Sequence, residues 1–251
     1  MYYETNGIKL YYEVYGTNNK NVILILPGWG NNRKTFENMI SILKETNKVF
    51  IIDIPGFGSS PLPNKDLTIY DYANIIKEFI IYNNITPTII SHSFGGRISI
   101  ILTGKYNLNI KKLILIDIAG IRRKSIKRFI KRNIYKIRKR LVYLIPKEKR
   151  VKYLLKLRNT YSSSDYLNLN KTMYKTFINI INEDLRKYVK NINNKTLILW
   201  GSNDMDTPIK DSYYYHKHIK NSNLIIFKNK SHFVYLEEPS INNIILNFIS
   251  K

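Results

Sequence analysis

The chain has no cysteine among its 251 residues. Disulfide bridges, thiolate ligands to a metal ion and a cysteine nucleophile are therefore excluded, because each of them needs a thiol. Histidine is scarce as well, with four residues. A reactive imidazole must be one of these four, and a nucleophile must come from another residue type.

Long apolar runs are also absent from the sequence. No stretch approaches the ~20 residues that a membrane-spanning helix needs. The first residues, Met1 to Gly7, have neither the basic start nor the apolar segment of a secretory leader. We therefore expect a cytoplasmic protein.

Acidic residues are few: 18 Asp and Glu stand against 41 Lys and Arg, and the formal net charge is +23. The excess is concentrated in residues 121–158, which hold 17 basic residues and one acidic residue, Glu148. A general bias of composition would not concentrate charge in this way, so part of it is expected to serve a purpose. The segment is either a solvated helical face or a docking surface for an anionic membrane or an acidic carrier protein. Nucleic acid is not an expected partner, because the segment lacks interleaved aromatic residues and a base-reading motif.

Strand-like and helix-like segments alternate along most of the chain. Asn6-Gly7 is a typical hairpin turn and predicts an antiparallel pair of strands around it. Residues 69–80, with Thr68 as N-cap, and residues 241–248 have helical spacing. Short apolar runs predict further strands at 22–26, 49–52, 88–90, 113–116, 196–200 and 224–227. This alternation predicts an α/β fold, in which helices cover both faces of a mostly parallel sheet.

The connection over residues 117–195 is far longer than one crossover helix requires. We therefore predict a core formed by residues 1–117 and 192–251, with residues 118–191 as a helical insertion. The length of the chain suits one domain that carries such an insertion.

Apolar spacing predicts three helices within this insertion. The first has an apolar stripe from Ile126 to Leu144, is basic at most other positions, and stops at Pro146. The second lies around residues 151–155, and the third covers residues 173–188.

A serine between a predicted strand and a predicted helix is the most informative feature. The segment Ser91-His92-Ser93-Phe94-Gly95 directly follows the strand at 88–90. In a nucleophile elbow the central serine adopts a strained backbone conformation, so the residues two positions away must be small. Ser91 and Gly95 meet this requirement, which predicts that Ser93 is a nucleophile.

His232 is the candidate base, and it follows the last predicted strand. An imidazole suits this role because it can take and return a proton near neutral pH. The other histidines are weaker candidates, since His92 belongs to the elbow itself and His216 and His218 are expected on a helix surface.

Asp204 is the candidate acid, directly after the penultimate predicted strand. A carboxylate on the far ring nitrogen of His232 would fix the tautomer and stabilise the imidazolium. Asp206, which could instead cap the helix opened by Pro208, and Asp117, at an earlier strand end, are the alternatives.

A Gly-rich turn, Pro27-Gly28-Trp29-Gly30, follows the first buried strand. Such a turn can direct a backbone N–H toward the nucleophile, and the amides of Trp29 and Phe94 are predicted to form an oxyanion hole. A second turn, Asp53-Ile54-Pro55-Gly56-Phe57-Gly58, follows another strand, and its glycines are expected to serve backbone shape.

In their order along the chain these segments resemble the α/β-hydrolase family. The order is oxyanion turn, Asp-x-Pro-Gly-x-Gly turn, nucleophile, acid and histidine, and it spans nearly the whole chain. The sequence departs from the family pattern at Pro27, where histidine is usual, and at Ser91, where glycine is usual; both departures leave the triad intact. The resemblance implies an eight-stranded, mostly parallel sheet flanked by helices, with residues 118–191 forming a helical cap that selects the substrate.

The same resemblance implies acyl transfer to Ser93 and then to water, without a metal ion or a cofactor. A serine at the elbow argues against the dehalogenases and epoxide hydrolases of the family, which use aspartate there. We therefore predict a serine hydrolase of a carboxylic ester or thioester. The alternatives are an aminopeptidase, a hydrolase of carbon–carbon bonds, and a non-catalytic docking protein. The basic cap is loosely similar to that of pimeloyl-carrier-protein methyl esterases, in which cap arginines contact the carrier.

Arg97 lies four residues after the predicted nucleophile. We expect it on the surface of the helix that follows the elbow, in an ion pair. Contact with a carboxylate of the substrate is the alternative role.

Overall fold

A computed structural model describes residues 1–122 and 171–251, with residues 135, 138, 140, 142, 146, 149–150 and 153–154 between them. The first two helices predicted in the insertion lie outside the described residues, apart from these single positions. Those helices, and the docking surface predicted for residues 121–158, therefore stay predictions.

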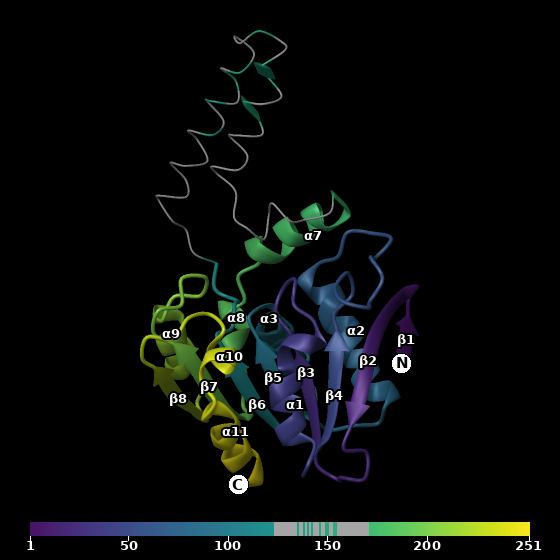
Figure 1. Ribbon diagram of the computed structural model, residues 1–251, viewed down its shortest axis with the longest axis vertical. Coiled ribbons are helices and arrows are strands. Elements are labelled where there is room, and N and C mark those ends of the chain that lie inside the picture. Colours follow the sequence, from purple (N-terminus) through teal and green to yellow (C-terminus); the bar gives the residue numbers. More distant parts are fainter. Residues whose placement is uncertain are drawn as a thin grey trace.

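Eight strands form one sheet in the order β1-β2-β4-β3-β5-β6-β7-β8 (Figure 1). β2 pairs antiparallel with both β1 and β4, and all the other neighbours are parallel. This arrangement confirms the predicted α/β sheet. The strands span Tyr2–Thr5 (β1), Ile8–Tyr15 (β2), Val22–Leu26 (β3), Lys48–Asp53 (β4), Thr88–His92 (β5), Lys112–Ile116 (β6), Lys195–Gly201 (β7) and Ser222–Phe227 (β8).

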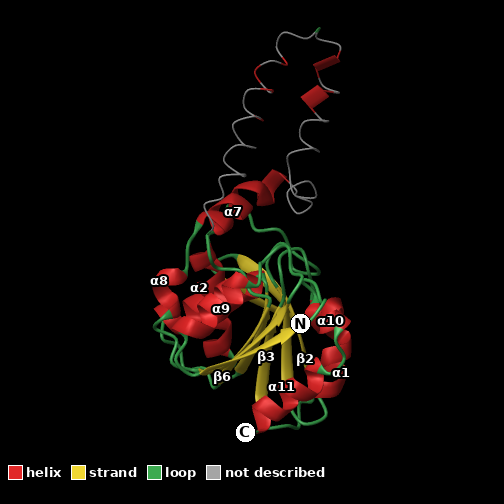
Figure 2. Cartoon of the chain, turned by 90° about the vertical axis from the view of Figure 1, so that its left-hand side faces the viewer, coloured by secondary structure: helices red, strands yellow, loops and turns green. Residues whose placement is uncertain are grey.

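Helices cover both faces of the sheet (Figure 2). Because side chains alternate along a strand, Leu24 of β3 packs into one apolar layer and Ile25 into the other. One layer includes residues of α2 (Ile69–Tyr82), α3 (Phe94–Ile100), α8 (Arg186–Val189) and α9 (Lys210–His218). The opposite layer includes residues of α1 (Glu37–Leu43), α10 (Val234–Glu237) and α11 (Ile241–Ser250).

The predicted start of α2 is confirmed in detail. The Thr68 side chain accepts a hydrogen bond from the backbone N–H of Asp71, and the Asp71 carboxylate accepts one from the backbone N–H of Thr68. This reciprocal capping box fixes where the helix begins. Its apolar stripe then packs on the sheet next to α3, the helix that follows the predicted nucleophile.

The third helix predicted in the insertion is wrong as a single helix. α7 spans Lys171–Asn182 and ends there, and α8 begins only at Arg186. The backbone N–H of Leu185 donates to the carbonyl of Gly120 instead of continuing the helix, and the Leu185 side chain is buried. Apolar spacing could not reveal this break, because it depends on a contact with a distant segment.

α7 lies beyond the carboxyl ends of the parallel strands (Figure 1). The hydroxyl of Thr176 accepts a hydrogen bond of 2.9 Å from the backbone N–H of Leu67. The ring centroid of Phe177 lies 5.2 Å from that of Trp29. α7 therefore contacts the turn that carries the predicted oxyanion amide. The division of the chain into core and cap stays a prediction.

Candidate active site

Ser93 occupies a strained turn between β5 and α3. Its backbone angles are φ 47° and ψ −108°, a region that costs a non-glycine residue about 1–3 kcal/mol. Two backbone bonds join the turn to residues 116–119: Ser93 N–H donates to Ile116 O at 3.2 Å, and Ala119 N–H donates to Ser93 O at 3.0 Å. Ser93 itself is partly exposed. The geometry has the strand, turn and helix that the sequence pattern predicts for a nucleophile elbow.

The glycine after the elbow is required by close packing. A Cβ atom on Gly95 would lie 2.1 Å from the carbonyl oxygen of Leu26 and 2.8 Å from that of Pro27. Neither backbone atom can move away easily, so only glycine fits. This contact also brings the turn after β3 directly against the elbow.

His232 and Asp204 form a buried pair. Nδ1 of His232 lies 2.7 Å from Oδ2 of Asp204, and the two residues are 8% and 4% exposed. An ionised carboxylate only accepts hydrogen bonds, so Nδ1 carries the proton in this contact. In the neutral ring Nε2 is then free to accept a proton.

The Asp204 carboxylate is held in its charged form. Although burial acts to raise its pKa, hydrogen bonds from His232 and Thr207 lower the pKa below the ordinary value. The Thr207 hydroxyl donates to Oδ2 at 2.5 Å, and the backbone N–H groups of Asp206 and Thr207 donate to Oδ1 at 2.8 Å. Sequence reasoning did not identify Thr207. An Asx-type turn after Asp204 is a local pattern that could have predicted the hydrogen bond from the backbone N–H of Thr207. No local pattern predicts the bond from its hydroxyl.

Ser93 and His232 follow two strands of the same sheet, β5 and β8, at the carboxyl ends. Among the described residues no hydrogen bond joins the Ser93 hydroxyl to His232. In unliganded enzymes this bond is often long and shortens when substrate binds. The ring of His92, the residue before Ser93, lies 4.8 Å from the ring of His232.

The two predicted oxyanion amides lie in neighbouring segments. Trp29 follows β3, Phe94 is the first residue of α3, and their ring centroids are 5.3 Å apart. Within the described part of the chain, neither backbone N–H donates a hydrogen bond. Their role as oxyanion donors stays a prediction.

Asp117, the alternative acid, is a buried carboxyl beside Asp204. Oδ1 accepts a hydrogen bond of 2.8 Å from Gly201 N–H, and Oδ2 lies 3.4 Å from Val234 N. Burial, together with the charge of Asp204, raises the pKa of Asp117 to about 9. Asp117 is therefore protonated near neutral pH. His232 donates its Nδ1–H hydrogen bond to Asp204, and Asp206 does not cap α9.

The turn after β4 has a structural role, as expected. A Cβ atom on Gly58 would lie 2.3 Å from the Asp53 carboxylate. Asp53 accepts hydrogen bonds from Ser59 N–H at 2.8 Å, and from the backbone N–H and guanidinium of Arg33 at 2.8 and 2.6 Å. The carboxylate thus fastens this turn to the segment after the oxyanion turn.

The expectation that Arg97 forms an ion pair on a helix surface is wrong. The residue is 6% exposed, and its Nη1 donates to the carbonyls of Ile180 and Glu183 at 3.0 Å each. These carbonyls lie at the end of α7, where a cation is favourable. Arg97 therefore connects the helix after Ser93 to α7. Its contact with a substrate carboxylate stays a prediction.

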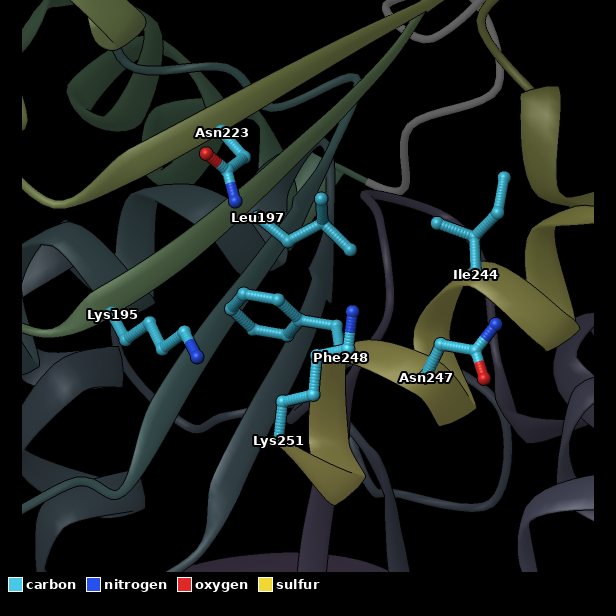
Figure 3. A pocket seen from close by; sticks show the side chains of 7 residues that line it. All are labelled: Lys195, Leu197, Asn223, Ile244, Asn247, Phe248 and Lys251. Atoms are coloured by element: carbon cyan, nitrogen blue, oxygen red, sulfur yellow. The ribbon is translucent and has the colours of Figure 1, made fainter.

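A cavity of about 240 Å³ lies at the other end of the sheet (Figure 3). Leu197, Ile244 and Phe248 line it, together with Lys195 at the start of β7 and Lys251 after α11. The candidate catalytic groups follow the opposite ends of the strands, so this cavity is not part of their site.

Within residues 1–122 and 171–251 and the single described positions between them, no three His, Asp or Glu side chains gather in a way that could hold a metal ion. No helix of the described chain is long and apolar enough to cross a membrane.

Comparison with known proteins agrees with the fold. A family described as alpha/beta hydrolase fold matches residues 21–239. The chain is 28% identical to "Putative esterase/lipase 2" of Mycoplasma genitalium, over 83% of this chain and 80% of that one. It is 25% identical to the "Pimeloyl-[acyl-carrier protein] methyl ester esterase" of Wigglesworthia glossinidia brevipalpis, over 96% and 98% of the two chains. An esterase structure from Exiguobacterium antarcticum has the same fold, with a TM-score of 0.76, 22% identity and coverage of 98% and 97% of the two chains.

Proposed function

The chain belongs to the α/β-hydrolase fold family and is a hydrolase, and on that premise we propose that it cleaves a carboxylic ester or thioester through an acyl-enzyme on Ser93. The observation that carries the proposal is the buried 2.7 Å contact between His232 Nδ1 and Asp204. It leaves Nε2 as the proton acceptor at the edge of the sheet where the strained Ser93 also lies.

In the proposed reaction, Ser93 Oγ attacks the carbonyl carbon of the substrate while Nε2 of His232 takes the hydroxyl proton. The resulting imidazolium is stabilised by Asp204. The carbonyl oxygen becomes an oxyanion, and the N–H groups of Trp29 and Phe94 stabilise it; such a donor is worth about 10²–10³ in rate. The leaving alcohol or thiol takes the proton from His232.

Water completes the proposed cycle. His232 removes a proton from the water, whose oxygen attacks the acyl-enzyme carbonyl. The second tetrahedral intermediate then collapses, the C–O bond to Ser93 breaks, and His232 returns the proton to Ser93 Oγ. The enzyme is thereby restored, and a carboxylic acid leaves.

The names of two relatives support an ester as substrate, since both are called esterases. The apolar surroundings of the site agree with an acyl chain as its occupant. Trp29 packs edge-on against Phe57 and Phe94, and Phe177 of α7 lies against the same indole. Docking of a carrier protein or an anionic membrane on residues 121–158 stays a prediction.

The proposal is tested with p-nitrophenyl esters of increasing acyl length and with a fluorophosphonate probe. The wild-type protein is expected to hydrolyse the esters and to be labelled once per chain. Ser93→Ala is expected to lose both the hydrolysis and the labelling. Hydrolysis and labelling that are the same in Ser93→Ala would overturn the proposal.

A further inference from the structure

His92 is a buried imidazole that the proposed reaction does not use. It is the last residue of β5, directly before Ser93, and its side chain is fully buried. Its ring lies among the rings of His232, Phe233 and Tyr235, at centroid distances of 4.8, 5.3 and 4.9 Å. A buried polar side chain in such surroundings normally has hydrogen-bond partners.

One ring nitrogen of His92 binds the main chain of the candidate base. Nε2 of His92 lies 2.8 Å from the carbonyl oxygen of His232. A carbonyl only accepts hydrogen bonds, so Nε2 carries the proton and donates. No other group in the described part of the chain donates to this carbonyl. The bond therefore joins the residue before the nucleophile to the residue that acts as base, 140 positions further along the chain.

The ring of His92 is neutral. Burial, together with the neighbouring His232, lowers the pKa of His92 to about 3. A neutral ring with its proton on Nε2 has none on Nδ1. Nδ1 is buried and has no hydrogen-bond partner among the described residues.

The unprotonated Nδ1 side of the ring faces the oxyanion turn. A Cβ atom on Gly28 would lie 2.8 Å from Nδ1 of His92 and 3.2 Å from its Cε1. Glycine at position 28 thus lets the turn approach the ring closely. Gly28 directly precedes Trp29, whose amide is a predicted oxyanion donor.

We infer that His92 is a positioning residue that holds the segment of His232, the nucleophile elbow and the oxyanion turn in one fixed arrangement. This inference rests on the proposed function for its effect on catalysis. The Nε2 bond prevents the His232 main chain from moving away from β5, and the ring sets the distance to Gly28. A neutral ring also leaves the imidazolium that forms on His232 without a second positive charge beside it.

Two substitutions at position 92 separate the hydrogen bond from the volume of the ring. His92→Gln places an amide N–H near the position of Nε2, whereas His92→Met has a similar size and no donor. His92→Met is expected to lower kcat by about 10- to 100-fold, because a buried carbonyl loses its partner and the base shifts. KM should stay within about twofold, since no substrate contact is lost. His92→Gln should retain most of the kcat.

His216→Met and His216→Gln are the matched controls, because His216 is exposed and lies on α9 outside the site. Both should have wild-type kcat and KM. Equal losses of kcat in His92→Met and His92→Gln, or no loss in either, would overturn the inference. If His92→Met does not fold, His92→Asn replaces it, because its shorter side chain cannot reach the His232 carbonyl.

A spectroscopic measurement distinguishes failure of this inference from failure of the proposed function. In protein labelled with ¹⁵N-histidine, His92, assigned by its absence in His92→Gln, should be a neutral Nε2–H tautomer from pH 8 to pH 5. A positively charged or Nδ1–H ring in this range would contradict the positioning role whatever the activity. A neutral Nε2–H ring in a protein that has no Ser93-dependent esterase activity would leave the geometry intact and overturn the proposed function instead.

Discussion

The carboxyl edge of the sheet and α7, the helix above it, are held in place in different ways. At the edge, Asp204 and His232 are buried, and Ser93 has a backbone conformation that only its surroundings maintain. α7 is attached by side chains at a few points, chiefly Thr176 and the cation of Arg97. We therefore expect the edge to determine the reaction and α7 to contribute to the choice of substrate.

The largest expected effect lies at the edge. In Asp204→Asn the amide no longer supplies the charge that orients His232 and stabilises its imidazolium, so kcat should fall by about 10⁴-fold. The measurement is steady-state hydrolysis of a short p-nitrophenyl ester. Asp206→Asn makes the same chemical change two residues away and should have little effect. Equal rates for the two variants would remove Asp204 from the mechanism.

Asp117 is expected to make the free energy of unfolding depend on pH. Its pKa is raised from 3.8 to about 9, so between these values the folded protein holds a proton that the unfolded chain releases. The free energy of unfolding should therefore fall as pH rises through this window, by up to about 1.4 kcal/mol per pH unit from this group. Asp117→Asn removes the titration while keeping a neutral side chain of the same shape. It should be more stable than wild type at pH 8, by a margin that shrinks toward pH 4.

Urea unfolding at pH 5, 6.5 and 8 measures that margin. A difference between Asp117→Asn and wild type that is the same at all three pH values would show that Asp117 is ionised in the folded protein. The edge would then contain two adjacent charged carboxylates, contrary to the account.

Arg97 is the point at which the two regions are joined. In Arg97→Met the carbonyls of Ile180 and Glu183 lose their shared donor, at a cost of about 1–3 kcal/mol of stability. KM for long acyl esters should rise several-fold as α7 loosens, with a smaller change for acetate esters. Arg186→Met loses an exposed pair with Asp184 and should cost at most about 1 kcal/mol. A uniform loss of kcat for all esters in Arg97→Met would argue against separate roles for the two regions.

The smallest effect is expected at Phe177, whose ring lies against Trp29. Phe177→Ala widens the space under α7, so the preferred acyl length in a p-nitrophenyl ester series should shift while kcat for the acetate changes by less than about threefold. Tyr174→Ala removes an exposed aromatic side chain from the same helix and serves as the control. An unchanged acyl preference in Phe177→Ala would exclude this part of α7 from the substrate site.

The sequence predicted the parts of the molecule that local pattern determines. Apolar runs identified the strands, and Thr68 as an N-cap residue identified the start of α2. The order of Ser93, Asp204 and His232 identified the residues that the proposal now places in the reaction. Each of these signals lies within a few residues of the feature that it predicts.

Contacts between distant segments could not be predicted in this way. Arg97 was expected on a surface because nothing near it in the sequence indicates that the end of α7 lies above it. His92 was assigned to the elbow and given no further role, since its partner is 140 residues away. The neutral state of Asp117 likewise depends on burial and on Asp204, neither of which a strand-end pattern reveals.

The central claim is that the edge of the sheet forms an acyl-enzyme on Ser93. Rapid acid quenching of the protein during turnover of a p-nitrophenyl ester, followed by peptide mass spectrometry, tests it directly. The account predicts the mass of one acyl group on the peptide that contains Ser93, and none in Ser93→Ala. An acyl group on another residue, or ester turnover that is the same in Ser93→Ala, would contradict it.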